Sequence, residues 1–224
     1  MADQNKFRVS GAAKRSRGAR AEEDRRSELI AISAKLFREK GYDRTTVRDI
    51  SGAAGIQSGS WFYYFKTKHD ILVAVIEEGM RQALSLMEEI AADPSPPREK
   101  FRKLVNAHLR IVLLPDQHFI QLLLYEWRSL GRAEKKRVVA IKDRYEAVWD
   151  KVIADLRKTG EWSMPTHVDR LFLFGALNWT AQWYRPNQNL SIEQLAERAI
   201  TFCLRTGEAE KIVSLPRKAK REEA

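Results

Sequence analysis

The sequence predicts an all-α fold of about nine helices, with a short N-terminal group of three and a larger helical body. Three observations lead to this prediction. Apolar residues recur at the spacing of a helix face along most of the chain, no segment alternates apolar and polar residues as a strand does, and Gly or Pro ends the candidate helices. With 224 residues, 44% of them hydrophobic, the chain can bury a substantial core.

The composition narrows the classes of partner. A formal net charge of +10 favours a polyanion, since Lys and Arg replace the counterions condensed on nucleic acid, although a basic protein need not bind one. The single cysteine, Cys203, permits no intrachain disulfide and no thiol-based metal site, which fits a reducing cytoplasm. No apolar run resembles a signal peptide or reaches the roughly 18 residues that span a bilayer. We therefore expect a cytoplasmic protein with no membrane partner.

Residues 1–24 are rich in Lys, Arg, Gly, Ala and Ser with hardly any large apolar residue, which predicts a flexible basic arm. Basic arms of this kind lie along phosphates or in a minor groove in some nucleic-acid-binding proteins, and a solvated tail is the alternative. From Arg25 to Lys40 apolar residues return at helical spacing. Gly41 is placed to end that helix as a C-terminal cap.

A second, short helix is predicted to begin at Thr46 or the residue before it. Asp49 stands three residues after Thr46, the spacing of a capping box, in which each side chain bonds the other residue's backbone N–H. Gly55 provides a tight turn, and the small residues around it let two helices cross closely. A third helix is expected from about Gln57 to Tyr64.

The third helix has the chemistry of a helix that reads DNA. It opens with short residues that let the backbone approach the major groove and that offer donors and acceptors to base edges: Gln57, Ser58, Gly59 and Ser60. The hydroxyls of Tyr63 and Tyr64 can reach phosphates while their rings touch sugars or thymine methyl groups. We expect Phe62 and Phe65 to serve a small core. Between Arg25 and Leu72 nine Lys and Arg stand against five Asp and Glu, so positive charge gathers in this segment.

The run LIAISAKLFREKGYDRTTVRDISGAAGIQSGSWFYYFKTKHDIL resembles the N-terminal DNA-binding domain of TetR/AcrR-type transcriptional regulators. The shared pattern is LF...KGY, TTVRDI, GAAGI, GS.FYYF and K.K..IL. Two residues depart from it: Trp61 replaces a smaller aliphatic residue, and Phe62 replaces a common tyrosine and so lacks its hydroxyl. We expect both to be packing residues. The resemblance implies a helix-turn-helix fold and DNA contacts from Thr46, Arg48, Gln57, Ser58, Gly59, Ser60, Tyr63, Tyr64 and Lys68.

The body begins with one long helix, capped by Thr67 and predicted to run from Lys68 to Ala92, where the sequence DPSPP forbids its continuation. Further helices are expected at 98–114, 117–129, 133–158, 166–185 and 191–206. A capping box of Ser191 and Gln194 opens the last of these. We place a DNA-binding domain at 25–72, a ligand-binding and dimerisation domain at 73–210 and a flexible basic tail at 211–224. Tilting the long helix, which enters both domains, would change the separation of two DNA-binding heads in a dimer.

The helix from Asp169 to Arg185 is apolar around most of its circumference, so it must be covered on more than one side. The family resemblance implies that this helix and the following one form a four-helix interface with a second copy of the chain across a two-fold axis. We therefore expect a homodimer.

A second feature of the body is a set of aromatic and polar residues that favours a small-molecule pocket, with core packing or dimer contact as the alternative for any one of them. Arg128, His108 and Asn178 would be awkward in a sealed core without partners. The segment WYRPNQNLS resembles members of the family that answer to acyl-coenzyme A thioesters, so the expected effector is such a thioester or a fatty acid. The expected pocket residues are His108, Tyr125, Arg128, Tyr145, Trp149, Asn178, Trp179 and Gln182.

The sequence offers no supported catalytic grouping and no histidine pair at metal-ligand spacing, so we expect no enzyme activity, no metal and no cofactor. The function that fits best is a homodimeric, ligand-responsive transcriptional regulator, most often a repressor, on a pseudo-palindromic double-stranded DNA operator. A non-specific nucleoid or RNA-binding protein that uses its basic tails is the alternative. An all-α enzyme that uses the body pocket is a third class, which the missing catalytic grouping disfavours.

Overall fold

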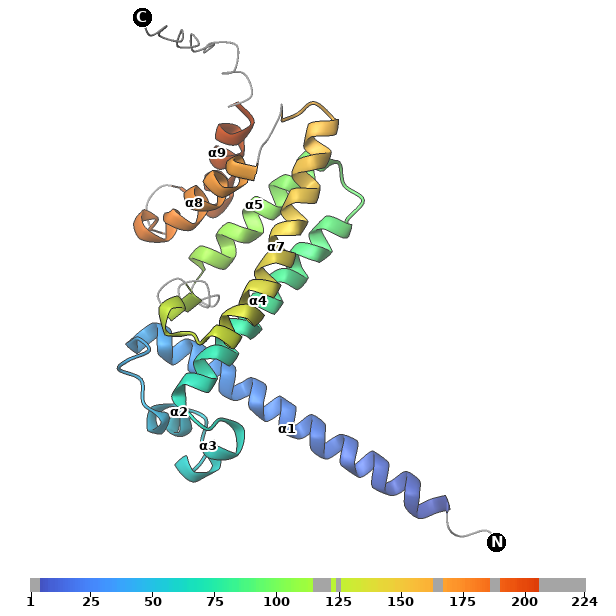
Figure 1. Ribbon diagram of the computed structural model, residues 1–224, viewed down its shortest axis with the longest axis vertical. Helices are drawn as coiled ribbons and strands as arrows, with labels where there is room; N and C mark the ends of the chain where they lie inside the picture. Colours follow the sequence, from blue (N-terminus) through green and yellow to red (C-terminus); the bar gives the residue numbers. More distant parts are fainter. Residues whose placement is uncertain (1–4, 115–121, 124–125, 163–166, 186–189, 206–224) are drawn as a thin grey trace, which may run out of the picture. The chain divides into compact units, whose positions relative to one another are not determined.

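The computed structural model describes residues 5–114, 122–123, 126–162, 167–185 and 190–205, of which 5–19 and 205 are described by their backbone alone. All regular structure in these ranges is helical, as predicted (Figure 1). The elements are α1 (Asn5–Lys40), α2 (Val47–Ala53), α3 (Ser58–Tyr64), α4 (Lys68–Ala92), α5 (Pro97–Leu113), the 3-10 turn η1 (Trp127–Ser129), α7 (Arg132–Lys158), α8 (His167–Trp183) and α9 (Ile192–Arg205).

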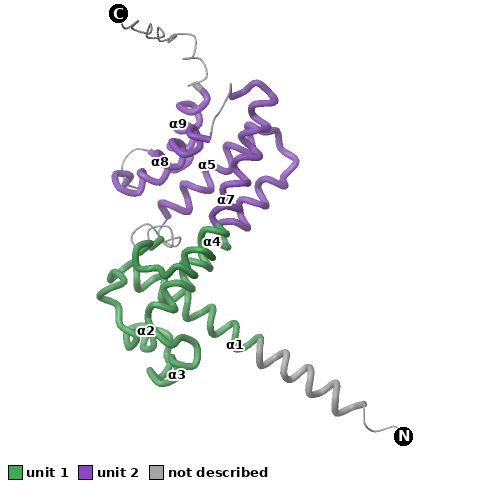
Figure 2. The backbone as a smooth tube through the Cα atoms, in the orientation of Figure 1, with its two compact units in different colours: residues 1–82, 115–141 green, residues 83–114, 142–224 purple. Residues whose placement is uncertain are grey.

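The chain forms two compact units (Figure 2). Unit 1 consists of residues 1–82 and 115–141, and unit 2 of residues 83–114 and 142–224. Both α4 and α7 therefore contribute residues to each unit. The change of unit along α4 follows Gln82, later than the 72/73 boundary that we expected from the sequence. The expected tail at 211–224 and most of the expected helix at 117–129 lie outside the described residues.

Helix α1 starts much earlier than predicted. It begins at Asn5, whereas the sequence indicated a helix from Arg25 and an irregular arm over residues 1–24. Residues 5–24 contain no proline and many Ala, Arg, Lys and Glu residues, which favour a helix without any apolar face to bury. The scarcity of large apolar residues in this segment therefore did not exclude a helix. At its other end α1 stops before Gly41, whose φ of 84° is the predicted helix-ending conformation.

Unit 1 is built around a single hydrophobic core. Leu29 and Phe37 of α1, Ile50 of α2 and Trp61 of α3 are all essentially inaccessible to solvent. The first two turns of α4 complete this core, together with residues before and within the start of α7: Ile71, Leu72, Val75, Ile76, Leu122, Leu130 and Val138. The short helices α2 and α3 thus derive their stability from tertiary packing, as helices of two turns must.

Three helices begin with the capping boxes or caps that the sequence predicted. At α2 the Asp49 backbone N–H donates to the Thr46 hydroxyl over 3.1 Å, and the Thr46 N–H donates to the Asp49 carboxylate over 2.8 Å. At α4 the same exchange joins Thr67 and Asp70, with distances of 2.9 and 3.1 Å. The third box opens α9, between Ser191 and Gln194. These bonds satisfy amide donors that a helix start leaves free.

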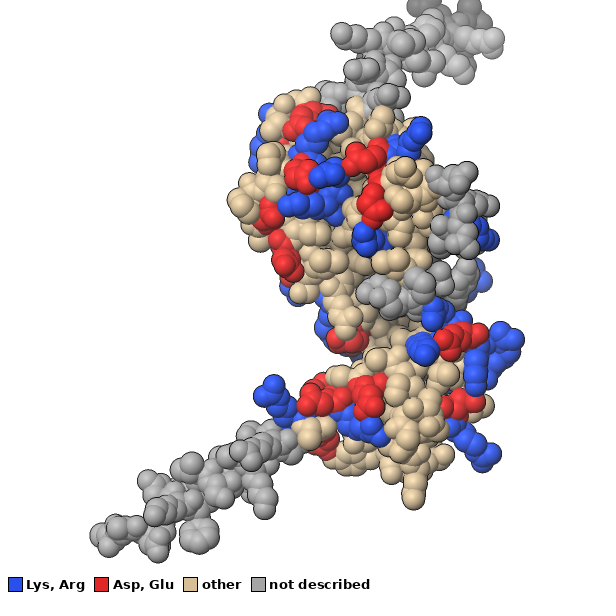
Figure 3. Space-filling model, turned by 180° about the vertical axis from the view of Figure 1, so that it is seen from behind, with Lys and Arg blue, Asp and Glu red and all other residues tan. Residues whose placement is uncertain are grey.

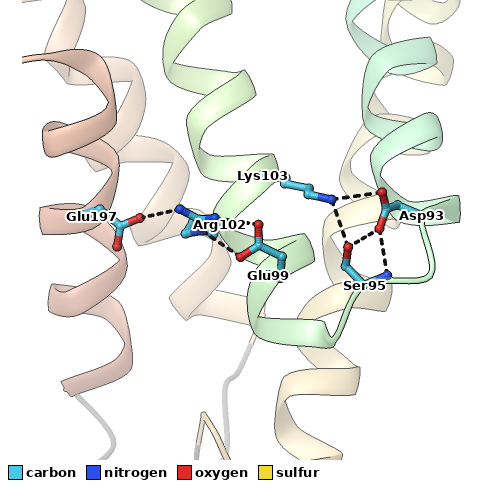
Figure 4. A network of polar contacts seen from close by, with 6 residues as sticks. All are labelled: Asp93, Ser95, Glu99, Arg102, Lys103 and Glu197. Atoms are coloured by element: carbon cyan, nitrogen blue, oxygen red, sulfur yellow. Dashed lines mark hydrogen bonds and ion pairs between the residues drawn. The ribbon is translucent and has the colours of Figure 1, made fainter.

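In unit 2, α5 packs against α8 and α9, and its buried face carries Phe101, Leu104 and Leu109. The proline-containing turn between α4 and α5 is fixed by the Lys103 ammonium, which donates to Asp93 over 3.0 Å and to the Ser95 hydroxyl over 2.9 Å (Figure 4). None of the described helices is long and apolar enough to cross a bilayer.

Candidate functional site

The turn between α2 and α3 is set by backbone geometry. Gly55 adopts a φ of 65°, which a residue with a side chain rarely adopts. The Ile56 N–H then donates to the Ser51 carbonyl over 3.0 Å, and the Gly55 N–H to the Gly52 carbonyl over 3.2 Å. This arrangement packs α3 against α2, as a helix-turn-helix requires.

Helix α3 has one inward stripe, formed by Trp61 and its neighbour one turn on, Phe65. Their rings lie 5.4 Å apart, and the two side chains are 0% and 4% exposed. The packing roles predicted for both residues are confirmed. The remaining surface of α3 faces solvent and presents the predicted base-reading residues Ser58, Gly59 and Ser60 with the ring of Tyr63.

Phe62 does not occupy the core, and the prediction that it packs there is wrong. Its side chain is 61% exposed, close to the 70% of Tyr63. The reason is helical geometry: Trp61 and Phe65, four residues apart, fill the inward stripe, so the residue that follows Trp61 is turned away by about 100°. Phe62 and Tyr63 therefore form an outward aromatic pair on α3.

The other residues implied in DNA contact surround this outward face. Thr46 and Arg48 at the start of α2 and Gln57 before α3 are exposed. Thr46 also caps α2, so part of its hydrogen-bonding capacity is used within the protein. Tyr64 is half-buried and holds the ring of Tyr63 edge-on, with ring centres 5.0 Å apart.

Lys68 differs from this group, because its charge is used inside unit 1. Its ammonium donates to the Tyr42 carbonyl over 2.9 Å and to the Asp43 carbonyl over 3.2 Å, and lies 4.3 Å from the centre of the Tyr42 ring. Arg25 makes a similar contact to the Ala54 carbonyl over 2.8 Å, which ties α1 to the end of α2. These two cations position the helices that carry the outward residues.

One acidic group of unit 1, Asp49, is also engaged within the protein. The Asp49 carboxylate accepts hydrogen bonds from Lys40 and Thr46, and these bonds hold its pKa well below the usual range. On the molecular face drawn in Figure 3, basic and acidic side chains are interspersed. The positive charge visible on that face is therefore not gathered into one patch.

Four of the residues expected in the effector pocket come together in the interior of unit 2. His108 lies 2.7 Å from the Tyr145 hydroxyl through Nδ1 and 3.1 Å from the Asn178 side-chain oxygen through Nε2. Since an amide oxygen accepts, Nε2 donates to Asn178 and the neutral imidazole accepts at Nδ1 from Tyr145. Burial lowers the pKa of His108 to about 4 and raises that of Tyr145. Trp149 meets the His108 ring edge-on at 5.8 Å.

The remaining expected pocket residues do not join this cluster. Arg128 is exposed and belongs to unit 1, and Tyr125 lies outside the described residues. Trp179 is 66% exposed, and Gln182 is also exposed on the same helix. Helix α8 is apolar on both faces, so its aromatic content did not indicate which side turns inward.

Two residues beside the cluster were missed from the sequence. Phe174 stacks on His108 with ring centres 5.5 Å apart, and Arg170, only 5% exposed, places its guanidinium 5.8 Å from the Phe174 ring centre. Arg170 also pairs with Glu146 over 2.5 Å. A signal was present, because positions 170, 174 and 178 repeat at four-residue spacing and fall on one stripe of α8.

Helices α8 and α9 also expose large apolar side chains. Along α8 the exposed residues follow one another at the spacing of a helix stripe, opposite the buried Leu173 and Leu177. We call these side chains the α8–α9 stripe: Val168, Leu171, Phe172, Trp179, Trp183 and Phe202. Large exposed aromatic side chains in one stripe mark an interaction surface.

Unit 2 also has an open hollow of about 410 Å³ beside α9. It is lined mainly by charged side chains of both signs, among them Arg102, Glu197 and Arg198, and Arg102 also pairs with Glu99 (Figure 4). This hollow does not coincide with the predicted aromatic pocket. Within the described residues, no three His, Cys, Asp or Glu side chains are grouped so that they could hold a metal ion.

Comparison with known proteins gives a consistent result. The profile "Bacterial regulatory proteins, tetR family" matches residues 29–75, and "Tetracyclin repressor-like, C-terminal domain" matches residues 94–206. The transcriptional repressor KstR2 of Mycobacterium tuberculosis is 26% identical over 185 residues, which are 80% of this chain and 91% of that protein. The fatty acid metabolism regulator of Bacillus subtilis is 23% identical over 176 residues, 77% of this chain and 90% of that protein.

Among solved structures, that of a protein named superantigen PfiT is 38% identical and has a TM-score of 0.72, with 81% of this chain and 96% of that chain covered. The two family profiles together span both the helix-turn-helix and the helical body described above. The chain belongs to the TetR family of transcriptional regulators.

Proposed function

We propose that this protein is a homodimeric transcriptional repressor of the cytoplasm that leaves its operator when a small molecule binds in unit 2. The observation that carries the proposal is the two-sided character of α3. Trp61 anchors the helix in the core, while Ser58, Ser60 and Tyr63 stand free in solvent at positions where a major groove would receive them. We assign direct DNA contact to the exposed residues Thr46, Arg48, Gln57, Ser58, Gly59, Ser60 and Tyr63, with Tyr64 at their edge and Lys68 as a positioning residue.

The α8–α9 stripe supports the homodimer. Six large apolar side chains exposed on two adjacent helices cost free energy in water, and a second copy of the same surface would cover them symmetrically. Two heads held in this way would enter successive major grooves about 34 Å apart. The operator should therefore be a pseudo-palindrome whose half-sites are one helical turn apart, or a multiple of it.

The effector site is proposed at the His108 cluster. The buried groups His108 and Tyr145 and the half-buried Asn178 bond one another, and aromatic rings lie against His108. An apolar ligand with one carbonyl group suits such a site, because the rings can cover its chain while a polar group holds the carbonyl. The name of the Bacillus subtilis relative refers to fatty acid metabolism, which supports a fatty acid or its coenzyme A thioester as the first class to test.

Release follows from differential affinity. In one conformation of the dimer, the two DNA-binding heads are too poorly placed to enter the operator together. A ligand that binds unit 2 most tightly in that conformation shifts the population away from the DNA-bound form. Helix α4 runs from the Thr67 cap through unit 1 into unit 2, so it offers one continuous path for this change.

The test has two steps. A binding sequence is selected from random duplexes with the full-length protein, and release is then measured across acyl-coenzyme A esters, free fatty acids and aromatic cations. We expect a palindromic sequence and release by the first two classes. A footprint without dyad symmetry would contradict the repressor assignment, and release by cationic compounds alone would contradict the thioester class.

The same duplexes separate this function from non-specific binding. A specific regulator should lose about 1–3 kcal/mol of binding free energy when Gln57 becomes Ala, whereas a protein that binds through its basic segments should be nearly unaffected and depend on salt alone.

A further inference from the structure

Phe62 is the apolar residue that α3 turns toward solvent. Its ring is 61% exposed although burial of a phenylalanine is strongly favourable, and no ring contact joins it to another described residue. The adjacent Tyr63 is 70% exposed, but its ring lies edge-on against that of Tyr64 and its hydroxyl can meet water. Phe62 has no polar atom, so its exposed ring needs an apolar partner.

The surroundings of Phe62 are shaped for close approach by another molecule. Gly59, three residues before it on the same side of α3, has no positive φ, and a Cβ added there would meet no atom within 4 Å. A glycine inside a helix costs up to about 1 kcal/mol relative to alanine, and no internal contact of this protein requires it. The space above Gly59, between Ser58 and Phe62, is therefore kept open toward solvent.

The chemistry of duplex DNA leaves one apolar feature for such a ring in the major groove. Phe62 has no polar side-chain atom, so it cannot form hydrogen bonds with the phosphates or with the donors and acceptors of the base edges. The C5-methyl group of thymine projects into the major groove and is read by apolar side chains. We propose that Phe62 is a specificity-determining residue that reads a thymine methyl group in each operator half-site. This inference rests on the proposed operator-binding function.

The experiment uses the full-length protein and the operator selected from random duplexes. Each thymine of the half-site is replaced in turn by uracil, which removes the methyl group and leaves base pairing unchanged. At one position the affinity of the native protein should fall about fourfold per half-site, since burial of one methyl group is worth about 0.8 kcal/mol. Replacement in both half-sites should lower it about fifteenfold, because the two effects multiply.

Three variants assign this loss to Phe62. In Phe62→Ala the thymine and uracil duplexes should bind equally well, since the ring that senses the methyl group is gone. Phe62→Leu keeps an apolar contact and should retain part of the difference. Tyr63→Ala is the matched control: it removes the neighbouring exposed ring and should leave the uracil effect at the Phe62 position in place. Both substituted side chains, Phe62 and Tyr63, are exposed in the native protein, so the thermal unfolding midpoint of each variant should be unchanged, which is checked alongside.

The outcomes are distinguishable. A uracil effect of the same size in Phe62→Ala and in the native protein overturns the assignment to Phe62, and so does a scan in which no thymine matters, while sequence-specific binding itself stands. If selection yields no preferred sequence at all, the operator-binding function fails and the reading by Phe62 fails with it.

Discussion

The two units each expose aromatic rings, but the residues around these rings differ. On α3 of unit 1, Phe62 and Tyr63 stand among Ser and Gly residues on a helix of two turns, and unit 1 also exposes the cations Arg48 and Lys66. In unit 2 the α8–α9 stripe extends along a helix of 17 residues, with Gly175 and Ala176 between its rings. Exposure alone does not identify a partner. Small polar neighbours and cations suit a polyanion with hydrogen-bonding edges, whereas a continuous apolar stripe suits a copy of itself.

The largest effect is expected from a substitution in unit 2 that tests whether the α8–α9 stripe binds a second copy of the chain. Trp179→Glu places a charge in the α8–α9 stripe, and the dimer dissociation constant should rise at least about 100-fold, as for a central interface residue. DNA affinity should fall with it, because two joined heads are needed. Sedimentation equilibrium and gel-shift titration measure the two quantities. The matched control is Ala147→Glu, which adds the same charge at an exposed position of α7 and should leave both unchanged. A variant Trp179→Glu that remains fully dimeric would contradict the proposed interface.

A second prediction compares two neighbouring rings within α3. Trp61→Ala removes a side chain with 0% exposure and should lower the free energy of unfolding by about 3–5 kcal/mol, whereas Phe62→Ala should change it by less than about 0.5 kcal/mol. Denaturant titration with tryptophan-independent detection, such as circular dichroism, measures both. Similar losses for the two variants would show that Phe62 packs within unit 1 after all.

A third prediction concerns the buried polar groups of unit 2. Because burial lowers the pKa of His108 from 6.5 to about 4, the unfolded chain binds a proton between these values that the folded protein does not. Stability should therefore rise as pH increases from about 4 to about 6.5 and then level off, with a total contribution of about 3 kcal/mol from this group. His108→Gln, which cannot titrate, should lose this part of the pH dependence. An unchanged slope in the variant would place the titration elsewhere.

The smallest expected effect separates stability from binding on α3. Gly59→Ala adds a Cβ that meets no atom of the protein, so unfolding should become harder by up to about 1 kcal/mol. DNA affinity should nevertheless fall about tenfold, within the range of a lost base-reading contact, if the backbone approaches the groove at this point. Thermal unfolding and gel-shift titration report the two effects. A variant that is more stable and binds as before would show that Gly59 does not lie against DNA.

The sequence predicted the starts and ends of helices correctly where these depend on capping residues or on glycine conformation. The box of Thr46 and Asp49, the turn at Gly55 and the helix end at Gly41 follow from spacing and from glycine conformation, and each is present as expected. Signals that depend on which side of a helix turns inward were less informative. In α3, two turns are too few for apolar periodicity to separate Trp61 from Phe62.

The pocket prediction was limited for the same reason. Helix α8 carries aromatic side chains both toward the interior, as Phe174, and toward solvent, as Trp179. A helix that is apolar all round shows that it is covered twice, but not which face meets the protein's own core. The sequence therefore placed Trp179 beside His108 and missed Phe174, although both lie on the helix it had selected.

The internal ties of unit 1 have an evolutionary consequence. Arg25 and Lys68 bond backbone carbonyls, and Trp61 fills the core, so the framework of the head is independent of the residues that α3 turns outward. If these outward residues read the operator as proposed, exchange of Ser58, Ser60 or Phe62 can redirect the protein toward other promoters without an intermediate that fails to fold. A lineage that duplicates such a gene can rewire its regulatory circuit one side chain at a time.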